Sequence, residues 1–262
     1  MRRLTARGVA PAEAAAWALR APTSPAGASG AASSPSSSAA AAVSGRRWGG
    51  GSRAIAVGHA GPAAHGLARA AVRLDAATLR DILELTIAGR GVVGAWDEAI
   101  LPVLIGIGDH YAATSKFIEV EHLVSRSVTE VLSAVARPPS TELPRVLLAA
   151  ADEEQHTLPL EALAAALAEA GIPSRLLGAR VPLEALTETV ARTGPSAVVI
   201  WSQLPPTGNP AQLARVLAAP HRPVLVAAAG PGWSKAELPP DALLLSSLTE
   251  AVAAVSAAVG PR

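Results

Sequence analysis

The 262-residue sequence contains no cysteine, which excludes disulfides, thiolate catalysis and cysteine-based zinc sites. This absence fits a reducing compartment. The first residues are interrupted by Pro11, Glu13 and Pro22 and do not form the apolar core of a signal peptide. No continuous apolar run approaches the roughly 18 residues that a membrane span needs. The sequence therefore predicts a cytoplasmic protein without a membrane partner.

The net charge is only +1, but the charged residues are distributed unevenly along the chain. Residues 1–80 carry ten arginines against Glu13 and Asp75, a net charge of +8, and the remaining residues carry −7. A basic front on an acidic body is compatible with an end that faces DNA. A solvated basic tail would have the same composition, so charge alone leaves both interpretations open.

Composition divides the chain into four parts. Residues 1–21 have a helical pattern. Residues 22–59 form a predicted flexible linker, because residues 21–45 are Ala, Gly, Pro or Ser apart from Thr23 and Val43. Residues 60–138 have helical periodicity, and residues 139–262 alternate between strand and helix patterns.

The third part predicts a bundle of four helices with short connections. Asp75 is a good N-cap for a helix that runs to about Ala88, and Gly89 and Gly91 are expected to break it. Two further helices are marked by apolar residues at spacings of three and four, over residues 96–107 and 117–132. With a helix before Asp75, this makes a small antiparallel bundle.

The fourth part predicts a flavodoxin-like, doubly wound α/β domain with five parallel strands covered by helices on both faces. The expected strands are residues 146–151, 176–178, 197–201, 224–229 and 243–245. The expected helices between and after them are residues 160–170, 182–192, 210–217 and 248–259. The predicted fold class is therefore α plus α/β.

Polar and small residues follow three of these strands. Glu154 and His156 follow the first strand, Ser202 and Leu204 follow the third, and Gly230 and Gly232 follow the fourth. The carboxyl ends of parallel strands form the ligand-binding edge of such a sheet. A histidine in this position can be a ligand, and a carboxylate two residues earlier can orient its ring. Small residues leave room for a large group.

The same residues carry a resemblance to the cobalamin-binding domain of methionine synthase, the corrinoid mutases and cobalamin-dependent regulators. Glu154-x-His156 is followed, after residues 160–201, by Ser202-x-Leu204 and then, after residues 205–229, by Gly230. The resemblance implies that cobalamin is the cofactor and that His156 replaces its dimethylbenzimidazole as the cobalt ligand. Ser202 and Leu204 would contact the nucleotide tail, and Gly230 and Gly232 would admit it. Pro159 and Pro231 depart from the family's glycines.

The helical part resembles the four-helix cap of MerR-type cobalamin photoreceptor regulators, which carry an aromatic residue ten positions before a Glu-His pair. Here Glu121-His122 is preceded by Tyr111 at that spacing. The resemblance implies that Tyr111, Glu121 and His122 lie over the upper face of a cobalamin, adenosylcobalamin foremost. The light-sensing members carry a histidine after the aromatic residue, whereas this chain has Ala112.

Residues 1–22 resemble the last helices of a MerR DNA-binding domain, but no winged helix-turn-helix pattern precedes them. DNA is therefore expected as a partner only if that winged helix is supplied. The leading hypothesis is a cobalamin-binding regulator, or its ligand-sensing part, that is not an enzyme and forms a homo-oligomer. The alternatives are a corrinoid carrier or methyltransferase module, and a scaffold without cofactor.

Overall fold

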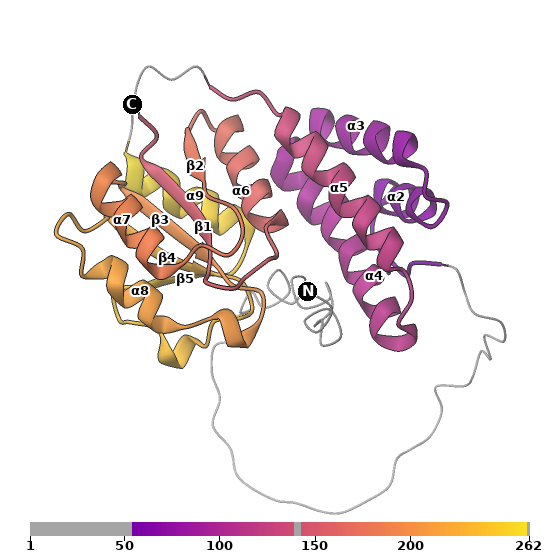
Figure 1. Ribbon diagram of the computed structural model, residues 1–262. Helices are drawn as coiled ribbons and strands as arrows, with labels where there is room; N and C mark the ends of the chain where they lie inside the picture. Colours follow the sequence, from indigo (N-terminus) through magenta and orange to yellow (C-terminus); the bar gives the residue numbers. More distant parts are fainter. Residues whose placement is uncertain (1–53, 139–142, 261–262) are drawn as a thin grey trace, which may run out of the picture.

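The computed structural model describes residues 54–138 and 143–260. The predicted MerR-like segment 1–21 and nearly all of the predicted linker lie outside the described residues. Figure 1 shows two parts side by side, a group of helices and an α/β domain. The predicted fold class, a helical bundle followed by a flavodoxin-like domain, is confirmed.

The bundle consists of α2 (Pro62–Val72), α3 (Ala76–Ala95), a π-helical turn η2 (Trp96–Ile100), α4 (Leu101–Thr114) and α5 (Ile118–Ala134). Asp75 caps α3 as expected, since its Oδ1 accepts the N–H of Thr78 at 3.0 Å. The predicted break at Gly89 is wrong, because the helix runs through it. Gly91 does interrupt the helix, at φ 69° and ψ 174°.

The sequence prediction of no membrane-length apolar segment needs a correction. The helical run Ala76–Thr114 is long and apolar enough to cross a membrane by length and composition alone. However, 61% of its most apolar window is buried inside the structure, and the run packs against the other helices of the bundle. This burial is typical of the core helix of a globular domain.

The α/β domain contains a parallel sheet in the order β2-β1-β3-β4-β5. Its elements are β1 (Val146–Ala150), α6 (Leu158–Glu169), β2 (Ser174–Leu176), α7 (Leu183–Thr193), β3 (Ala197–Trp201), η3 (Pro205–Thr207), α8 (Pro210–Leu217), β4 (Leu225–Ala229), η4 (Lys235–Glu237), β5 (Leu243–Leu245) and α9 (Leu248–Val259). The strand order reverses between β1 and β3, so the loops after these strands flank the crevice of the sheet.

The predicted second strand is displaced by two residues. Residues 174–176 rather than 176–178 form β2, because Val146 of β1 pairs with Ser174 and Leu148 pairs with Leu176. The carbonyl of Gly178 instead accepts the N–H of Ala150 at 3.0 Å. The other four strands lie within one residue of their predicted positions.

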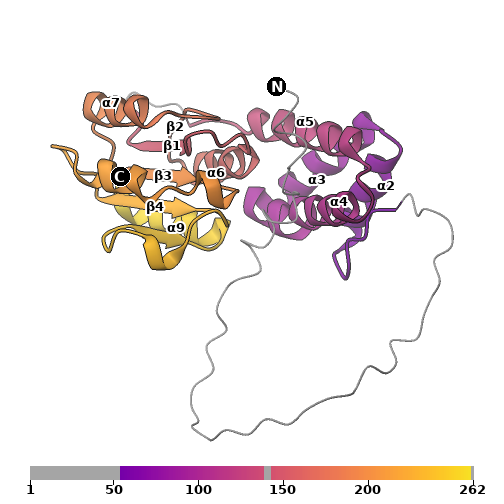
Figure 2. The ribbon, with the colours of Figure 1, turned by 60° about the horizontal axis from the view of Figure 1, so that its bottom comes forward.

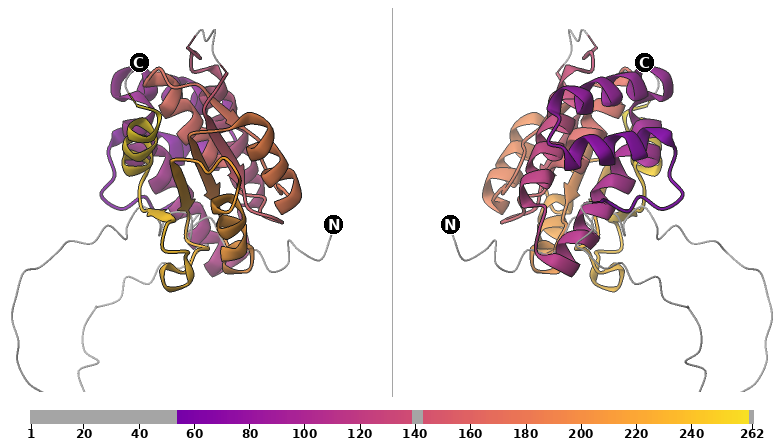
Figure 3. Two further views of the ribbon diagram at one scale, coloured as in Figure 1. Left: turned by 90° about the vertical axis from the view of Figure 1, so that its left-hand side faces the viewer. Right: turned by 90° about the vertical axis from the view of Figure 1, so that its right-hand side faces the viewer.

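The two faces of the sheet belong to different hydrophobic clusters. Leu147, Val198 and Ile200 pack with α7 and α8 in one cluster. Leu148, Val199 and Trp201 point to the opposite face and join α6, α9 and the helical bundle in the other. Figure 2 shows the bundle next to α6, outside the α/β layers, and Figure 3 shows the same two parts end on, one in front of the other.

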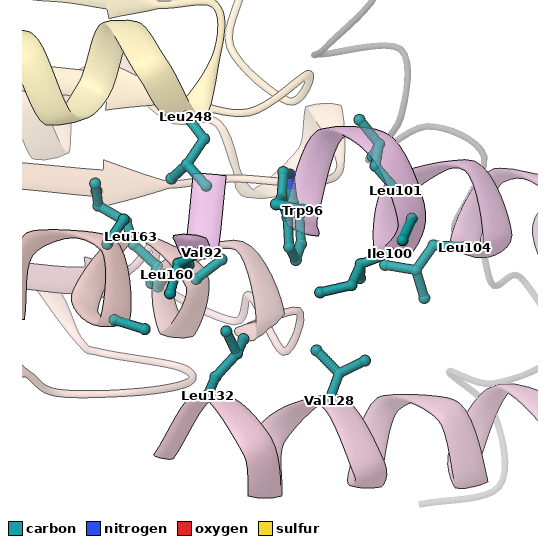
Figure 4. Packing of buried hydrophobic residues seen from close by; sticks show 14 of the residues in the cluster. Val92, Trp96, Ile100, Leu101, Leu104, Val128, Leu132, Leu160, Leu163 and Leu248 are labelled. Carbon is teal, nitrogen blue, oxygen red and sulfur yellow. The ribbon is translucent and has the colours of Figure 1, made fainter. Parts of the chain in front are cut away.

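Helix α6 is the shared element of the two parts. Its sequence is apolar nearly all round, which is expected of a helix that is covered on every side. In Figure 4, Leu160 and Leu163 of α6 lie next to Val92, and Leu132 of α5 approaches from the other side. The bundle and the sheet therefore bury one continuous core.

Polar contacts in the C-terminal half of α6 stabilise this interface. The N–H of Val92, just after the break at Gly91, donates to Oε2 of Glu169 at 2.8 Å. The guanidinium of Arg137 donates to the carbonyl of Ala164 at 2.8 Å. Glu169 thus serves as a cap, from the other domain, for the helix that resumes at Val92.

The segment before α2 also packs on the bundle. Ile55 and Val57, which the sequence assigns to the linker, are buried. Gly106 of α4 permits this contact, because a Cβ at Gly106 would stand 2.4 Å from the carbonyl oxygen of Ala56. The chain therefore joins the bundle through a segment seated against α4.

Candidate functional site

The loop after β1 places a buried carboxylate at the ligand-binding edge of the sheet. Glu154 is fully buried, although it follows the exposed Glu153, whose φ is 61°. The N–H of Arg180, after β2, donates to the carbonyl of Glu154 at 2.7 Å, and the Arg180 side chain forms an ion pair with Glu153. These contacts hold the loop so that the Glu154 side chain points inward.

Oxygen Oε1 of Glu154 holds His156. It accepts the N–H groups of Gln155 at 2.8 Å and His156 at 2.9 Å, and it lies 2.5 Å from Nδ1 of the His156 ring. The carboxylate therefore favours the tautomer with a proton on Nδ1, which leaves the lone pair on Nε2. The His156 side chain is 37% exposed, so this nitrogen belongs to a ring that an external ligand can reach.

Oxygen Oε2 of Glu154 holds the loop after β3. It accepts the N–H of Gln203 at 2.7 Å and the hydroxyl of Thr207 at 2.8 Å. Burial raises the pKa of Glu154, but the hydrogen bonds from His156, Thr207 and Gln203 outweigh burial and hold the pKa at about 2. Glu154 is therefore ionised at neutral pH and connects the loops after β1 and β3.

Ser202 and Leu204 lie in the same network. The Ser202 hydroxyl lies 2.7 Å from Oγ1 of Thr207 and 3.1 Å from the carbonyl oxygen of Leu204. Ser202 is fully buried and Leu204 is partly buried. The structure thus brings together Glu154, His156, Ser202 and Leu204, as the motif spacing predicts.

The glycines after β4 accommodate the loop after β3. A Cβ at Gly230 would lie 2.2 Å from the carbonyl oxygen of Ser202, and a Cβ at Gly232 would lie 2.1 Å from the Ser202 hydroxyl. The N–H of Gly232 donates to the carbonyl of Ser202 at 2.9 Å. The room that these glycines provide is therefore filled by backbone and side-chain atoms of residues 202–204, and their predicted contact with a cofactor stays a prediction.

The two prolines that depart from the family's pattern fit the local structure. Pro159 is buried in the first turn of α6, where a backbone N–H has no helical partner and proline is well tolerated. Pro231 is partly buried between Gly230 and Gly232. Neither proline disturbs the hydrogen bonds around Glu154.

The bundle contributes a carboxylate to the same region. Burial raises the pKa of Glu121 on α5, and the nearby His122 and His156 lower it by their charge. Glu121 is thus close enough to His156 to feel its ring electrostatically, although 35 positions separate them in the sequence. His122 is exposed beside it.

Tyr111 lies one helix earlier, on α4, and is partly buried. Its neighbour Ala112 is exposed. His110, on the other flank, stacks on Phe117 with ring centroids 3.9 Å apart. This stacking occupies one face of the His110 ring.

The donor set indicates which kind of metal the site could hold. Among residues 54–138 and 143–260, no three His, Asp or Glu side chains are grouped so that they could hold a metal ion by themselves. His156 would be a single protein ligand, which fits a metal whose other positions are filled by a macrocycle such as a corrin. The carboxylate–imidazole pair is the support that a metal-binding histidine requires.

Two cavities of the described residues lie elsewhere. One of about 210 Å³ is lined by Arg137, Ala164 and Ser174, near the beginning of β2, and one of about 350 Å³ lies between α7 and α8. Neither includes His156 or Glu154. The candidate site is therefore identified by its polar side chains, and not by either of these cavities.

Two residues of the network were not predicted from the sequence. Thr207 supplies a hydroxyl to Glu154, and Gln203 supplies its N–H. Gln203 stands inside the Ser202-x-Leu204 motif, so the motif pointed to its loop without indicating its side chain. Thr207 carried no signal, because only the turn Pro205–Thr207 returns it to Glu154.

The fold, in which a helical part precedes a flavodoxin-like domain, is one that corrinoid-binding proteins share, and the comparisons with known proteins point to the same class. Residues 63–136, the helical bundle, match the family described as "B12 binding domain". The chain is 30% identical over 125 residues to the HTH-type transcriptional repressor CarH of Myxococcus xanthus. That alignment covers 47% of this chain and 42% of the repressor, so the chain spans less than half of this relative's length.

A solved structure supports the fold. The chain resembles the monomethylamine corrinoid protein of Methanosarcina barkeri with a TM-score of 0.56, over 72% of this chain and 94% of that protein. The two sequences are only 16% identical, so this likeness concerns the fold alone.

Proposed function

We propose that this chain is the cobalamin-sensing part of a MerR-type transcriptional regulator. The observation that carries the proposal is the His156 imidazole, held through Nδ1 by the buried Glu154, with Nε2 directed away from that contact. In this proposal Nε2 of His156 ligates cobalt in place of the cofactor's own base. Cobalamin would supply a cobalt centre whose upper ligand can be exchanged.

The protein residues have separate tasks in this proposal. Glu154, ionised because its pKa is about 2, fixes the His156 tautomer and raises the basicity of the ring. Ser202 and Leu204 line the path of the nucleotide tail. Glu121 and His122, with Tyr111, form the protein surface above the cofactor, and adenosylcobalamin is the form for which the resemblance argues most strongly.

Absorption spectroscopy tests the cobalt ligand. Purified protein is mixed with hydroxocobalamin or adenosylcobalamin, and the corrin bands are recorded after removal of free ligand. We expect the absorption bands of a histidine-ligated corrinoid, and His156→Ala should abolish these bands. His221→Ala, at an exposed histidine outside this network, is the matched control. A His156→Ala spectrum identical to that of the unmodified protein would refute the assignment.

The regulator interpretation is supported by the identity to a transcriptional repressor and by the placement of Glu121 near His156. It predicts that cobalamin changes the oligomeric state or the DNA affinity of the intact regulator. For this chain we expect DNA binding that depends only on phosphate attraction to the basic front and is therefore steeply salt-dependent. Sequence-specific binding that survives at roughly 200 mM salt would contradict this expectation.

A corrinoid carrier is the second candidate, favoured by the fold likeness to a corrinoid protein. A carrier would present its cofactor to a separate methyltransferase, whereas a sensor would act through DNA. The genes that neighbour this one distinguish the two cheaply: methyltransferase genes would favour the carrier, and a divergent cobalamin-related operon would favour the regulator. In both cases we propose a binding role for this chain, and not catalysis by the chain alone.

A further inference from the structure

A buried side-chain amide at the site has no hydrogen-bond partner among the described residues. Gln203 is fully buried, and neither Oε1 nor Nε2 of its side chain has a hydrogen-bond partner among the described residues. A buried carboxamide normally satisfies both groups, because an unpaired donor or acceptor loses its hydration without compensation. An unpaired buried amide of this kind points to a ligand that supplies the missing hydrogen bonds when it binds.

The domain contains a direct contrast. Gln212 is also buried, but its Oε1 accepts the N–H of Asp152 at 3.0 Å and its Nε2 donates to the carbonyl of Thr207 at 3.2 Å. Gln212 therefore acts as a structural bridge between the loops after β1 and β3. Gln203, in the same loop system, contributes only its backbone to such bridging.

The position of Gln203 indicates which part of a ligand could reach it. Glu154 stands between His156, held by Oε1, and Gln203, held by Oε2. A corrin ring centred on the partly exposed His156 must remain at the surface, so only a narrow arm could extend to a fully buried amide. Gln203 is followed by the partly buried Leu204 and the exposed Pro205, so the loop runs from the buried amide to the surface within two residues.

We propose that the Gln203 carboxamide hydrogen-bonds to the nucleotide arm of a bound corrinoid and makes the site selective for corrinoids that carry this arm. The inference rests on the proposed cobalamin binding and deepens it. The arm offers phosphate, ribose and base groups, and a carboxamide can donate to one and accept from another. Gln203 then completes the recognition that the Ser202–Leu204 loop begins.

Two variants and two ligands test the inference. Gln203→Leu keeps the volume and removes both polar groups, and Gln212→Leu does the same at the structural glutamine. Each protein is melted without ligand and titrated with hydroxocobalamin and with diaquocobinamide, which lacks the nucleotide. We expect Gln203→Leu to melt at or above the temperature of the unmodified protein but to bind hydroxocobalamin about tenfold more weakly. Its affinity for diaquocobinamide should be unchanged, and Gln212→Leu should melt at a lower temperature.

Each other outcome has a distinct meaning. If Gln203→Leu melts earlier, as Gln212→Leu should, the amide has a partner in the free protein and the inference is wrong. Equal hydroxocobalamin binding by Gln203→Leu and the unmodified protein also overturns it, and equal losses for both ligands overturn the assignment to the nucleotide. If the unmodified protein binds neither ligand, the proposed function itself fails.

Discussion

Glu154 joins two loops that the sequence keeps about 50 positions apart. Its two oxygens accept from His156 on one side and from Gln203 and Thr207 on the other. Because the carboxylate is fully buried, these donors replace its hydration and determine where the imidazole stands. A change at this single residue therefore acts on both loops.

We predict that Glu154→Gln lowers cobalamin affinity by about 10- to 100-fold, the usual effect of losing a carboxylate that orients a metal-binding histidine. It should also lower the free energy of unfolding by about 1–3 kcal/mol, because an amide nitrogen cannot accept the hydrogen bonds of one carboxylate oxygen. Spectral titration and urea unfolding measure the two effects. Glu188→Gln, at an exposed carboxylate on α7, should alter neither by more than about 0.5 kcal/mol. Equal behaviour of the two variants would contradict this account.

The depressed pKa of Glu154 also predicts a pH dependence. The group has an ordinary pKa of 4.5 and a pKa of about 2 in the folded protein. Its contribution to stability is therefore complete above about pH 4.5 and is lost as the pH falls towards 2. Urea unfolding at pH 6 and pH 3 should show a larger gap between the unmodified protein and Glu154→Gln at pH 6. A gap that widens at pH 3 would show that the sign is wrong.

At the residue scale, spacing predicted the association of Glu154, His156, Ser202 and Leu204, since each follows a parallel strand whose end lies at one edge. The sequence did not reveal the orphan amide of Gln203. Burial of both polar atoms depends on how the loop folds, and no local pattern encodes it. The proposed cofactor contacts of Tyr111, Glu121 and His122 stay predictions.

At the scale of elements, the break in α3 depends on a residue from the other domain. Gly89 and Gly91 look alike in the sequence, yet only Gly91 has a positive φ. Glu169, which is distant in the chain, accepts the N–H that the break frees at Val92. No inspection of residues 76–95 alone could have distinguished the two glycines.

This difference yields a paired prediction. Gly91→Ala should lower the free energy of unfolding by about 1–2 kcal/mol, because an alanine at φ 69° is strained and its Cβ would stand 3.2 Å from Oε2 of Glu169. Gly89→Ala should raise it by up to about 1 kcal/mol, because the added Cβ meets nothing within 4 Å in a helix. Thermal or urea unfolding of both variants provides the test. Stabilisation by both substitutions would mean that α3 runs unbroken in solution.

The displacement of β2 has a similar origin. Leu176 and Leu177 suggested a buried strand, but they are 38% and 39% exposed. They lie at the edge of the sheet, where only β1 provides a neighbour. The register with β1, and not apolarity, decides where such a short edge strand begins.

For the whole molecule, the sequence predicted two folded parts, the helical bundle and the α/β domain, but not how they share a core. Helix α6 is apolar nearly all round because the sheet covers it on one side and the bundle covers it on the other. Which helices of the bundle make that contact follows from side-chain packing over long distances. Periodicity carries no information about it.

The arrangement of the bundle bears on any response to light. We predict that, if adenosylcobalamin bound here is photolysed, no second protein imidazole ligates the cobalt. Ala112 offers no nitrogen, His110 is stacked on Phe117, and His122 belongs to the next helix. Spectra recorded before and after illumination should lack stable bis-imidazole bands, and Ala112→His should gain them. Such bands in the unmodified protein that persist in His122→Ala would show that the assumed position of α4 is wrong.

The packing of Ile55 and Val57 against α4 determines which segment would move if α4 moved. Gly106, which receives this segment, stands five positions before Tyr111 on the same helix. A rotation of α4 imposed from the cofactor side would therefore move Ile55 and Val57 with it. The direction in which the chain enters the bundle at residues 55–57 is therefore set by the position of α4, and it would differ between two states of the site that place α4 differently.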